Sequence, residues 1–245
     1  MNTPARLLAV LATLLTFAGC ASLPQGARPD PRDRFERFNR SMFAFNQTLD
    51  KAVARPIAVG YRKITPKPVR TSVSNFFGNL GYPTVIVNDL LQGKLKPFAQ
   101  DTGRLLVNTT IGIGGLFDPA TRMGLGANDE DLGQTFGKWG IRSGPYLMLP
   151  LMGPSSIRDG VGSVGDHFTH PRTYIGDPYV RYGLTAFELV SKREELLETD
   201  SVLNKSFDPY AFVRTAYLQR REYQVHDGDV PEAAEETEVP DDITP

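Results

Sequence analysis

The sequence predicts a mainly α-helical, single-domain protein, and three observations carry this prediction. Apolar residues recur at helical spacing over most of the 245-residue chain. Several prolines stand where such periodic segments begin, which suits a helix start because the first turn needs no intrahelical N–H donor. Only the region 135–150 carries the short apolar runs and turn residues of a β-hairpin or hairpin-like loop.

The N-terminal segment has the features of a secretory signal. Arg6 precedes an apolar run over residues 7–17, and two small residues stand immediately before Cys20. This order resembles a bacterial lipobox, in which the chain is cleaved before a cysteine that then receives acyl chains. Cys20 is the only cysteine, so it cannot form an intramolecular disulfide. We predict a signal peptide over 1–19 and lipidation at Cys20; a plain signal peptide with an incidental cysteine is the alternative.

The exported chain is predicted to have three parts. Residues 20–34 are rich in proline and charge and are typical of a tether between lipid and folded domain. Residues 35–223 carry the helical periodicity and form the predicted domain. Residues 224–245 are predicted to be a disordered acidic tail, because eight carboxylates and no basic residue follow His226. Export excludes nucleic acid as a partner.

The predicted helices follow from spacing and from breakers. Phe35, Phe38, Met42, Phe45, Leu49 and Ala52 share one helix face, and Pro56 is expected to end that helix. Pro83 is expected to begin another helix, over 84–92, which Gly93 closes. Further helices are predicted near 97–108, 178–197 and 209–223. The hairpin is predicted from apolar runs over 135–141 and 146–149, separated by the turn residues 142–145.

A basic stretch indicates contact with a membrane surface. Residues 51–88 contain six basic side chains and no carboxylate. No segment after Cys20 has the roughly 18 apolar residues that a spanning helix needs, so we expect amphipathic helices that lie along the membrane plane. The candidates for contact with anionic lipid head groups are Lys51, Arg55, Arg62 and Lys63. A solvated basic face is the alternative.

The sequence contains no convincing catalytic set, so we predict that the protein is not an enzyme. Asp166, His167 and His170 have spacing that suits two metal ligands on a helix, but a third ligand is missing nearby. Ser155 lacks the G-x-S-x-G context of a nucleophile elbow. We therefore predict neither a metal nor a cofactor.

Several motifs between residues 33 and 223 resemble the VacJ/MlaA lipoproteins. They include Phe38-Asn39-Arg40-x-Met42-Phe43-x-Phe45-Asn46, Ser74-Asn75-Phe76-x-Gly78-Asn79-Leu80, Asn108-Thr109-Thr110-Ile111-Gly112-x-Gly114-Gly115, Leu132-Gly133-Gln134-Thr135-x-Gly137-x-Trp139-Gly140 and Gly144-Pro145-Tyr146-x-x-Leu149-Pro150-x-x-Gly153-Pro154-Ser155.

The resemblance implies an outer-membrane lipoprotein that helps to keep the membrane lipid-asymmetric. Its fold would be a ring of amphipathic helices in the membrane plane around a central channel. Mislocalised phospholipids would leave the outer leaflet through this channel and pass to a periplasmic carrier of the Mla type for retrograde transport. Trimeric porins are a further implied partner. The acidic tail is a candidate contact for the carrier; a solubilising tail without a partner is the alternative.

The glycine-rich turn at 112–115 and the region 135–153 are our candidates for the channel wall and its gate. The individual candidates are Gly112, Gly114, Gly115, Trp139, Gly144, Tyr146, Leu149 and Pro150. For the glycines, ordinary turn geometry is the alternative. Two other functions stay open: a structural, porin-associated lipoprotein without transport activity, and a periplasmic hydrolase that uses Ser155 or the two histidines.

Overall fold

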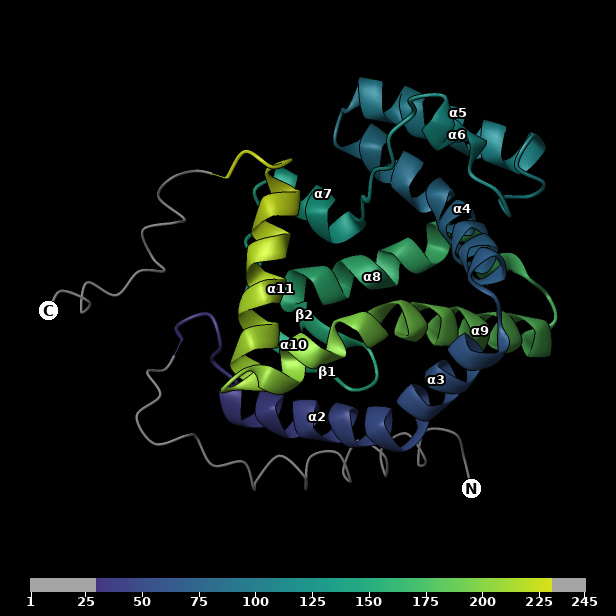
Figure 1. Ribbon diagram of the computed structural model, residues 1–245. Coiled ribbons are helices and arrows are strands. Elements are labelled where there is room, and N and C mark those ends of the chain that lie inside the picture. The colour runs from purple at the N-terminus through teal and green to yellow at the C-terminus, as the bar shows by residue number, and fades with distance from the viewer. Residues whose placement is uncertain (1–29, 231–245) are drawn as a thin grey trace, which may run out of the picture.

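The computed structural model describes residues 30–230, and it confirms the mainly helical class with one short hairpin (Figure 1). The elements in chain order are α2 (Glu36–Leu49), η1 (Asp50–Ala54), α3 (Arg55–Ile64), α4 (Lys67–Leu91), α5 (Leu95–Thr110), α6 (Pro119–Arg122), α7 (Leu132–Lys138), β1 (Tyr146–Leu149), β2 (Gly153–Ser156), α8 (Ile157–Thr169), η2 (Pro171–Tyr174), α9 (Pro178–Glu195), η3 (Leu196–Glu198), α10 (Asp200–Lys205) and α11 (Pro209–Val225).

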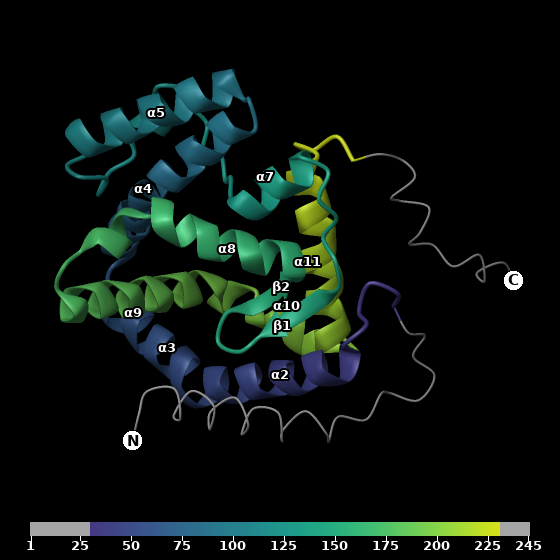
Figure 2. The same cartoon turned by 180° about the vertical axis from the view of Figure 1, so that it is seen from behind.

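The helices form a frame around two crossing helices. In Figure 1, α2 and α3 run along the lower edge, α4 stands on one side and α11 on the other, while α8 and α9 cross the space between them. The view from behind shows the same arrangement, with α5 packed beyond α4 (Figure 2). Within residues 30–230, none of the helices combines the length and hydropathy that crossing a bilayer requires.

The expectation that Pro56 ends the first helix is wrong. The backbone stays helical from α2 through a π-helical segment, η1, into α3. Pro56 lies in the first turn of α3, where the wider π turn has already interrupted the regular α-helical hydrogen bonding. A proline placed there removes little, because its N–H would have had no regular α-helical partner.

The expectation that Pro83 begins a helix is also wrong. Pro83 lies inside α4, a helix of 25 residues. An internal proline removes one hydrogen bond and costs about 3 kcal/mol in an isolated helix. The extensive packing of α4 against α5 offsets that cost. The predicted end of the helix is confirmed, since Gly93 has a φ of 73° in the left-handed region that favours glycine.

The hairpin exists, but its strands differ from the predicted pair. β1 pairs antiparallel with β2, so that Tyr146 lies opposite Ser156. The predicted partner run, 135–141, begins within helix α7 instead. The Asp131 side chain caps α7 by accepting a hydrogen bond from the Gln134 N–H at 2.8 Å. A helix that the sequence reading missed, α8, follows the hairpin directly and is capped by Ser156.

A cluster of buried apolar side chains lies where α2, the hairpin and α11 meet. Met42, Tyr146, Met148 and Tyr210 are almost fully buried there. The Tyr146 ring contacts Tyr210 and Tyr217 edge-on, with ring centroids 6.3 and 5.8 Å apart. This cluster fixes the hairpin between the first and last helices.

Two asparagines of α2 hold the hairpin by its backbone. Asn39 donates from Nδ2 to the Tyr146 carbonyl at 3.0 Å and accepts from the Met148 N–H at 2.8 Å. Asn46 does the same with the Leu149 carbonyl, at 2.9 Å, and the Leu151 N–H, at 2.8 Å. Seven residues separate the two asparagines, so they lie two turns apart on one face of α2.

The packed body extends beyond both predicted boundaries of the domain. Asp33, inside the predicted tether, is buried and accepts hydrogen bonds from Asn39 at 2.7 Å and Arg214 at 3.0 Å. Asp227, inside the predicted tail, forms an ion pair with Lys138 at 3.0 Å. The predicted signal peptide, Cys20 and the residues after 230 lie outside the described residues.

Candidate functional site

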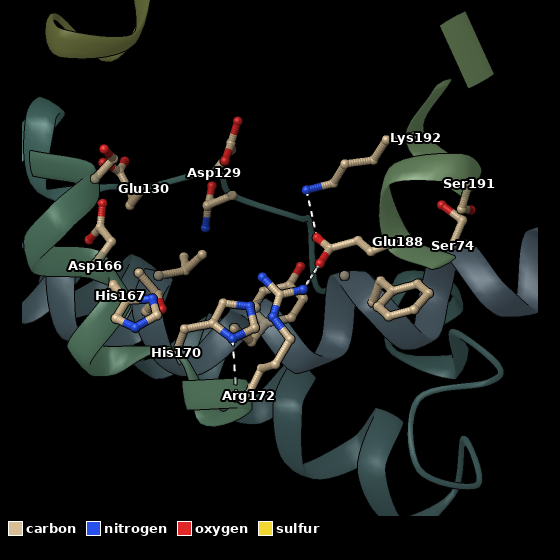
Figure 3. Close-up of a pocket in the computed structure, with 18 of the residues that line it drawn as sticks. Ser74, Asp129, Glu130, Asp166, His167, His170, Arg172, Glu188, Ser191 and Lys192 are labelled. Atoms are coloured by element: carbon tan, nitrogen blue, oxygen red, sulfur yellow. Dashed lines mark hydrogen bonds and ion pairs between the residues drawn. The ribbon is translucent and has the colours of Figure 1, made fainter. Parts of the chain in front are cut away.

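A hollow of about 580 Å³ lies between α4, α8, η2 and α9 (Figure 3). Residues at helical spacing line it from two sides. On α9 these are Glu188, Ser191, Lys192 and Glu195, and on α4 they include Ser74, Phe77, Gly78, Gly81 and Val85. Each set follows the i, i+3, i+4, i+7 spacing of a single helix face.

The charged centre of the hollow joins η2 to α9. The Glu188 carboxylate accepts from Lys192 Nζ at 2.7 Å and from the Arg172 guanidinium, as Figure 3 shows. Burial alone would raise the pKa of Glu188, but Lys192 and Arg172 outweigh it and the pKa is lowered. The Glu188 carboxylate is therefore ionised at neutral pH and holds both cations at the wall of the hollow.

The opposite wall is formed by α8. Asp166 accepts from the Asn88 side chain at 3.0 Å and from the Leu132 N–H at 3.1 Å. Burial raises the pKa of Asp166 above its usual value. His170 lies nearby, and its pKa is lowered by burial and by the Arg172 charge. The D-H-x-x-H cluster therefore lines the hollow, although residues 30–230 hold no group of three His, Cys, Asp or Glu side chains placed to bind a metal.

The α4 wall leaves room for a ligand. A Cβ atom added to Gly78 or Gly81 would meet no atom within 4 Å. The hollow thus combines an open helix face with cations and carboxylates on the walls around it. Such a site can accommodate a polar group that carries both signs of charge, and apolar side chains such as Phe77 and Val85 can contact a hydrocarbon part.

The glycine candidates for the channel wall form a tight turn instead of lining this hollow. Gly114 and Gly115 have φ values of 68° and 89°. A Cβ on Gly115 would lie 2.5 Å from the Asn79 Cβ, and one on Gly112 would lie 2.4 Å from the Asn108 carbonyl oxygen. Close packing against α4 and α5 explains these glycines, and their role in a channel stays a prediction.

The remaining gate candidates occupy different environments. Tyr146 is fully buried in the core, and burial raises the pKa of its hydroxyl. Trp139 is half-exposed and donates from Nε1 to the Leu91 carbonyl at 3.1 Å. Gly144 has a φ of 70° just before the hairpin. Leu149 ends β1 and Pro150 begins the loop to β2, so these two stand at the hairpin tip.

The four candidate head-group cations divide into two kinds. Arg55 pairs with Asp200 at 3.0 Å, and Arg62 pairs with Glu194 at 2.6 Å, so both tie α3 to the α9–α10 region. Lys51 and Lys63 are exposed and have no ion pair with any residue between 30 and 230. Only the two lysines therefore keep an uncompensated charge.

A buried carboxylate pair, with one residue on α4 and one on α5, predicts a pH-dependent stability. Asp89 and Asp101 are fully buried, and burial together with the Asp101 charge raises the pKa of Asp89 to about 7. The folded state then holds a proton that the unfolded chain has already released above pH ~4. The free energy of unfolding is therefore expected to fall as pH rises from about 4 to about 7.

The substitution Asp89→Asn is expected to flatten this pH dependence and to stabilise the protein at pH 8 by about 2 kcal/mol. Urea unfolding at a series of pH values measures both effects. Asp129→Asn is the matched control, because the Asp129 side chain is 71% exposed. An unchanged pH profile in Asp89→Asn would contradict the interpretation that Asp89 holds a proton in the folded state.

The exterior differs from that of an ordinary helical protein because many large apolar side chains are exposed. They include Ile64, Leu95, Ile113, Val164, Phe168 and Tyr179. Exposed apolar side chains are the groups through which a protein can enter a membrane or contact a partner. Fold and site together define a helical protein with a mixed-charge hollow and an extensively apolar surface.

The comparisons with known proteins identify the family. Residues 31–224 match the MlaA lipoprotein family, and the chain belongs to that family. It is 36% identical over 227 residues to the intermembrane phospholipid transport system lipoprotein MlaA of Escherichia coli, covering 91% of this chain and 89% of the relative. The protein of the same name from Haemophilus influenzae is 31% identical over 245 residues, covering 97% and 96%.

A solved structure shares the fold. It belongs to work described as "Structural basis for maintenance of bacterial outer membrane lipid asymmetry". The two chains superpose with a TM-score of 0.71 at 36% identity, over 79% of this chain and 98% of that one. The predicted membership of the VacJ/MlaA lipoproteins is thereby confirmed.

Proposed function

We propose that this protein is an outer-membrane lipoprotein that removes mislocalised phospholipids from the outer leaflet. In this proposal the lipids pass through an amphipathic channel between the helices to a periplasmic carrier, which returns them by retrograde transport. The E. coli and H. influenzae relatives are named as lipoproteins of an intermembrane phospholipid transport system, which supports the proposal. No covalent step is required, so the protein would not act as an enzyme.

The observation that carries the proposal is the mixed-charge hollow. A phospholipid head group is charged and cannot cross an apolar barrier without paired groups, because burying an unpaired charge costs many kcal/mol. Arg172 and Lys192 offer partners for a phosphate, and Glu188 and Glu195 offer partners for an ammonium group. The open α4 face at Gly78 and Gly81 supplies the space.

The proposed seat is the inner leaflet of the outer membrane, with the protein facing the periplasm. Acyl chains on Cys20 would anchor the chain, and the exposed apolar side chains would enter the leaflet. Lys51 and Lys63 would contact phosphates at the surface. Trimeric porins and a periplasmic carrier of the Mla type are the proposed protein partners, with the acidic tail after residue 227 as the contact for the carrier.

Filling the hollow tests this function directly. Gly81→Phe places a ring in open space on the α4 wall, so it is expected to block lipid passage without disturbing the fold. In cells that lack the native gene, outer-leaflet phospholipid is expected to stay at the deletion level with Gly81→Phe and to return to normal with the wild type. Cys20→Ala is expected to complement poorly.

Gly60→Phe is the matched control for this experiment. A Cβ at Gly60 also meets no atom within 4 Å, but Gly60 lies on α3 and does not line the hollow. It should complement like the wild type. If Gly81→Phe also complements fully at normal protein levels, lipid does not pass through the hollow. If the deletion accumulates no outer-leaflet phospholipid, a structural role beside porins would replace the transport function.

A further inference from the structure

A second cavity, of about 900 Å³, lies between α2, the hairpin and the α9–α11 corner. We call it the α10 pocket. Its walls are mainly apolar and include Phe43, Met148, Leu196, Val202, Leu203 and Phe212. Its volume is within the range of about 300–1,000 Å³ that is typical of ligand sites. The α10 pocket is thus large enough and apolar enough to hold a hydrocarbon chain.

One wall of the α10 pocket is charged, and its charges do not cancel. Arg193 donates to Asp50 at 2.6 and 2.9 Å and to Asp200 at 2.9 Å. Arg55 donates to Asp200 at 3.0 Å. Lys51 also lines the pocket and has no ion pair with any residue in the described range. Three cations therefore face two carboxylates, and the excess charge is positive.

Two further observations point to an anionic group at this wall. The Nη1 atom of Arg193 is buried and has no hydrogen-bond partner among the described residues, so one strong donor is unused. Asp50 and Lys51 belong to the π-helical segment η1, and π turns inside α-helices are frequent at functional sites. An anion beside Lys51 and Arg193 would neutralise the excess positive charge of this wall.

We propose that the α10 pocket binds a phospholipid, with one acyl chain against Val202, Leu203 and Phe212 and the phosphate beside Lys51 and Arg193. This site is separate from the hollow, because α9 presents Lys192 and Glu195 to the hollow, whereas Arg193 of α9 and Leu196 of η3 line the α10 pocket. The choice of a phospholipid rests on the proposed function; the pocket and its charged wall do not.

Photolabelling of the full-length protein tests the site. The protein is mixed with phosphatidylglycerol vesicles that carry a diazirine on one acyl chain, irradiated, and mapped by peptide mass spectrometry. Label is expected on peptides from α10 and the hairpin. Val202→Trp should reduce it about tenfold by filling the pocket, and because Val202 is half-exposed this variant is expected to fold.

The phosphate position has its own matched pair of variants. Lys51→Ala is expected to weaken labelling of α10 about fivefold, since it removes the uncompensated cation. Lys67→Ala removes another exposed lysine of the same basic stretch, one that does not line the α10 pocket, and it should leave labelling of α10 unchanged. A diazirine-labelled diacylglycerol, which has no phosphate, should label α10 equally in both variants.

Several results would overturn the inference. Label confined to the peptides of the hollow, on α4 and α8, would refute the second site and leave the proposed function intact. Equal effects of Lys51→Ala and Lys67→Ala would refute the phosphate position. Label from a diazirine fatty acid but not from the phospholipid would refute the assigned ligand. Label that appears only in Cys20→Ala protein would assign the α10 pocket to the protein's own acyl chains.

Discussion

Replacing Arg221 by methionine is expected to lower the free energy of unfolding by about 3–5 kcal/mol, the largest effect of any single substitution considered. The Arg221 guanidinium contacts Asp131 at 2.6 and 2.9 Å and Asp159 at 2.9 and 3.2 Å. Asp131 caps α7, and Asp159 lies in the first turn of α8. One side chain of α11 thus holds the starts of two helices, and its loss leaves two carboxylates without their main partner.

The pH dependence of this loss follows from the pKa of Asp159. Burial opposes its ionisation, but Arg221, Tyr217 and Arg158 outweigh burial and hold the pKa at about 2. A lowered carboxyl pKa contributes stability above the unfolded value of about 4, and this stability is lost as pH falls toward 2. The difference between wild type and Arg221→Met should therefore be largest near neutral pH and shrink in acid.

Arg220→Met is the matched control for Arg221. The neighbouring arginine pairs with Asp129 at 3.2 Å, but both side chains are 71% exposed. An exposed pair of this kind contributes at most about 1 kcal/mol, so the urea midpoint should hardly move. A loss below about 1 kcal/mol for Arg221→Met would mean that the two carboxylates find other partners.

Gly162→Ala is expected to destabilise the protein by about 2–3 kcal/mol through overpacking. A Cβ at Gly162, on α8, would lie 2.5 Å from the Gly133 backbone nitrogen and 2.9 Å from its Cα, on α7. Neither atom can move without displacing α7, because both belong to the backbone. Urea unfolding of the purified variant measures the loss.

Gly160→Ala, on the same helix, should have the opposite sign. The nearest atom to a Cβ there is the Ser155 hydroxyl oxygen at 3.7 Å, an ordinary contact. Alanine then stabilises by about 0.4–1 kcal/mol, because it restricts the unfolded chain. Equal destabilisation by both alanine variants would contradict the overpacking explanation, because only Gly162 lies against the α7 backbone.

The helices could be predicted because their signals are local. Periodicity and N-terminal proline place α9 and α11 within a few residues of their observed ends. The predictions at Pro56 and Pro83 are wrong because the surrounding structure overrides the local preference of proline. A π turn precedes Pro56, and α4 packs against α5 around Pro83. No local signal separates a proline that begins a helix from one that lies inside a long helix.

Most of the candidate site could not be predicted from the sequence, for a different reason. Arg172 and Glu188 belong to different elements, and their contact exists only after α9 packs beside η2. A usable signal was present in α9, where Glu188, Ser191, Lys192 and Glu195 form a polar face at helical spacing. The spacing of His167 and His170 suggests only a metal site. In the structure, both histidines line the hollow together with this polar face.

The asparagine contacts of α2 have a consequence for association between chains. A two-stranded sheet normally exposes backbone donors and acceptors that can pair with a strand of another molecule. Along β1, the Tyr146 N–H donates to the Arg32 carbonyl at 2.8 Å, and Asn39 and Asn46 engage backbone groups of Tyr146, Met148, Leu149 and Leu151. Side-chain amides thus stand in for a third strand, and this edge is closed to edge-to-edge aggregation.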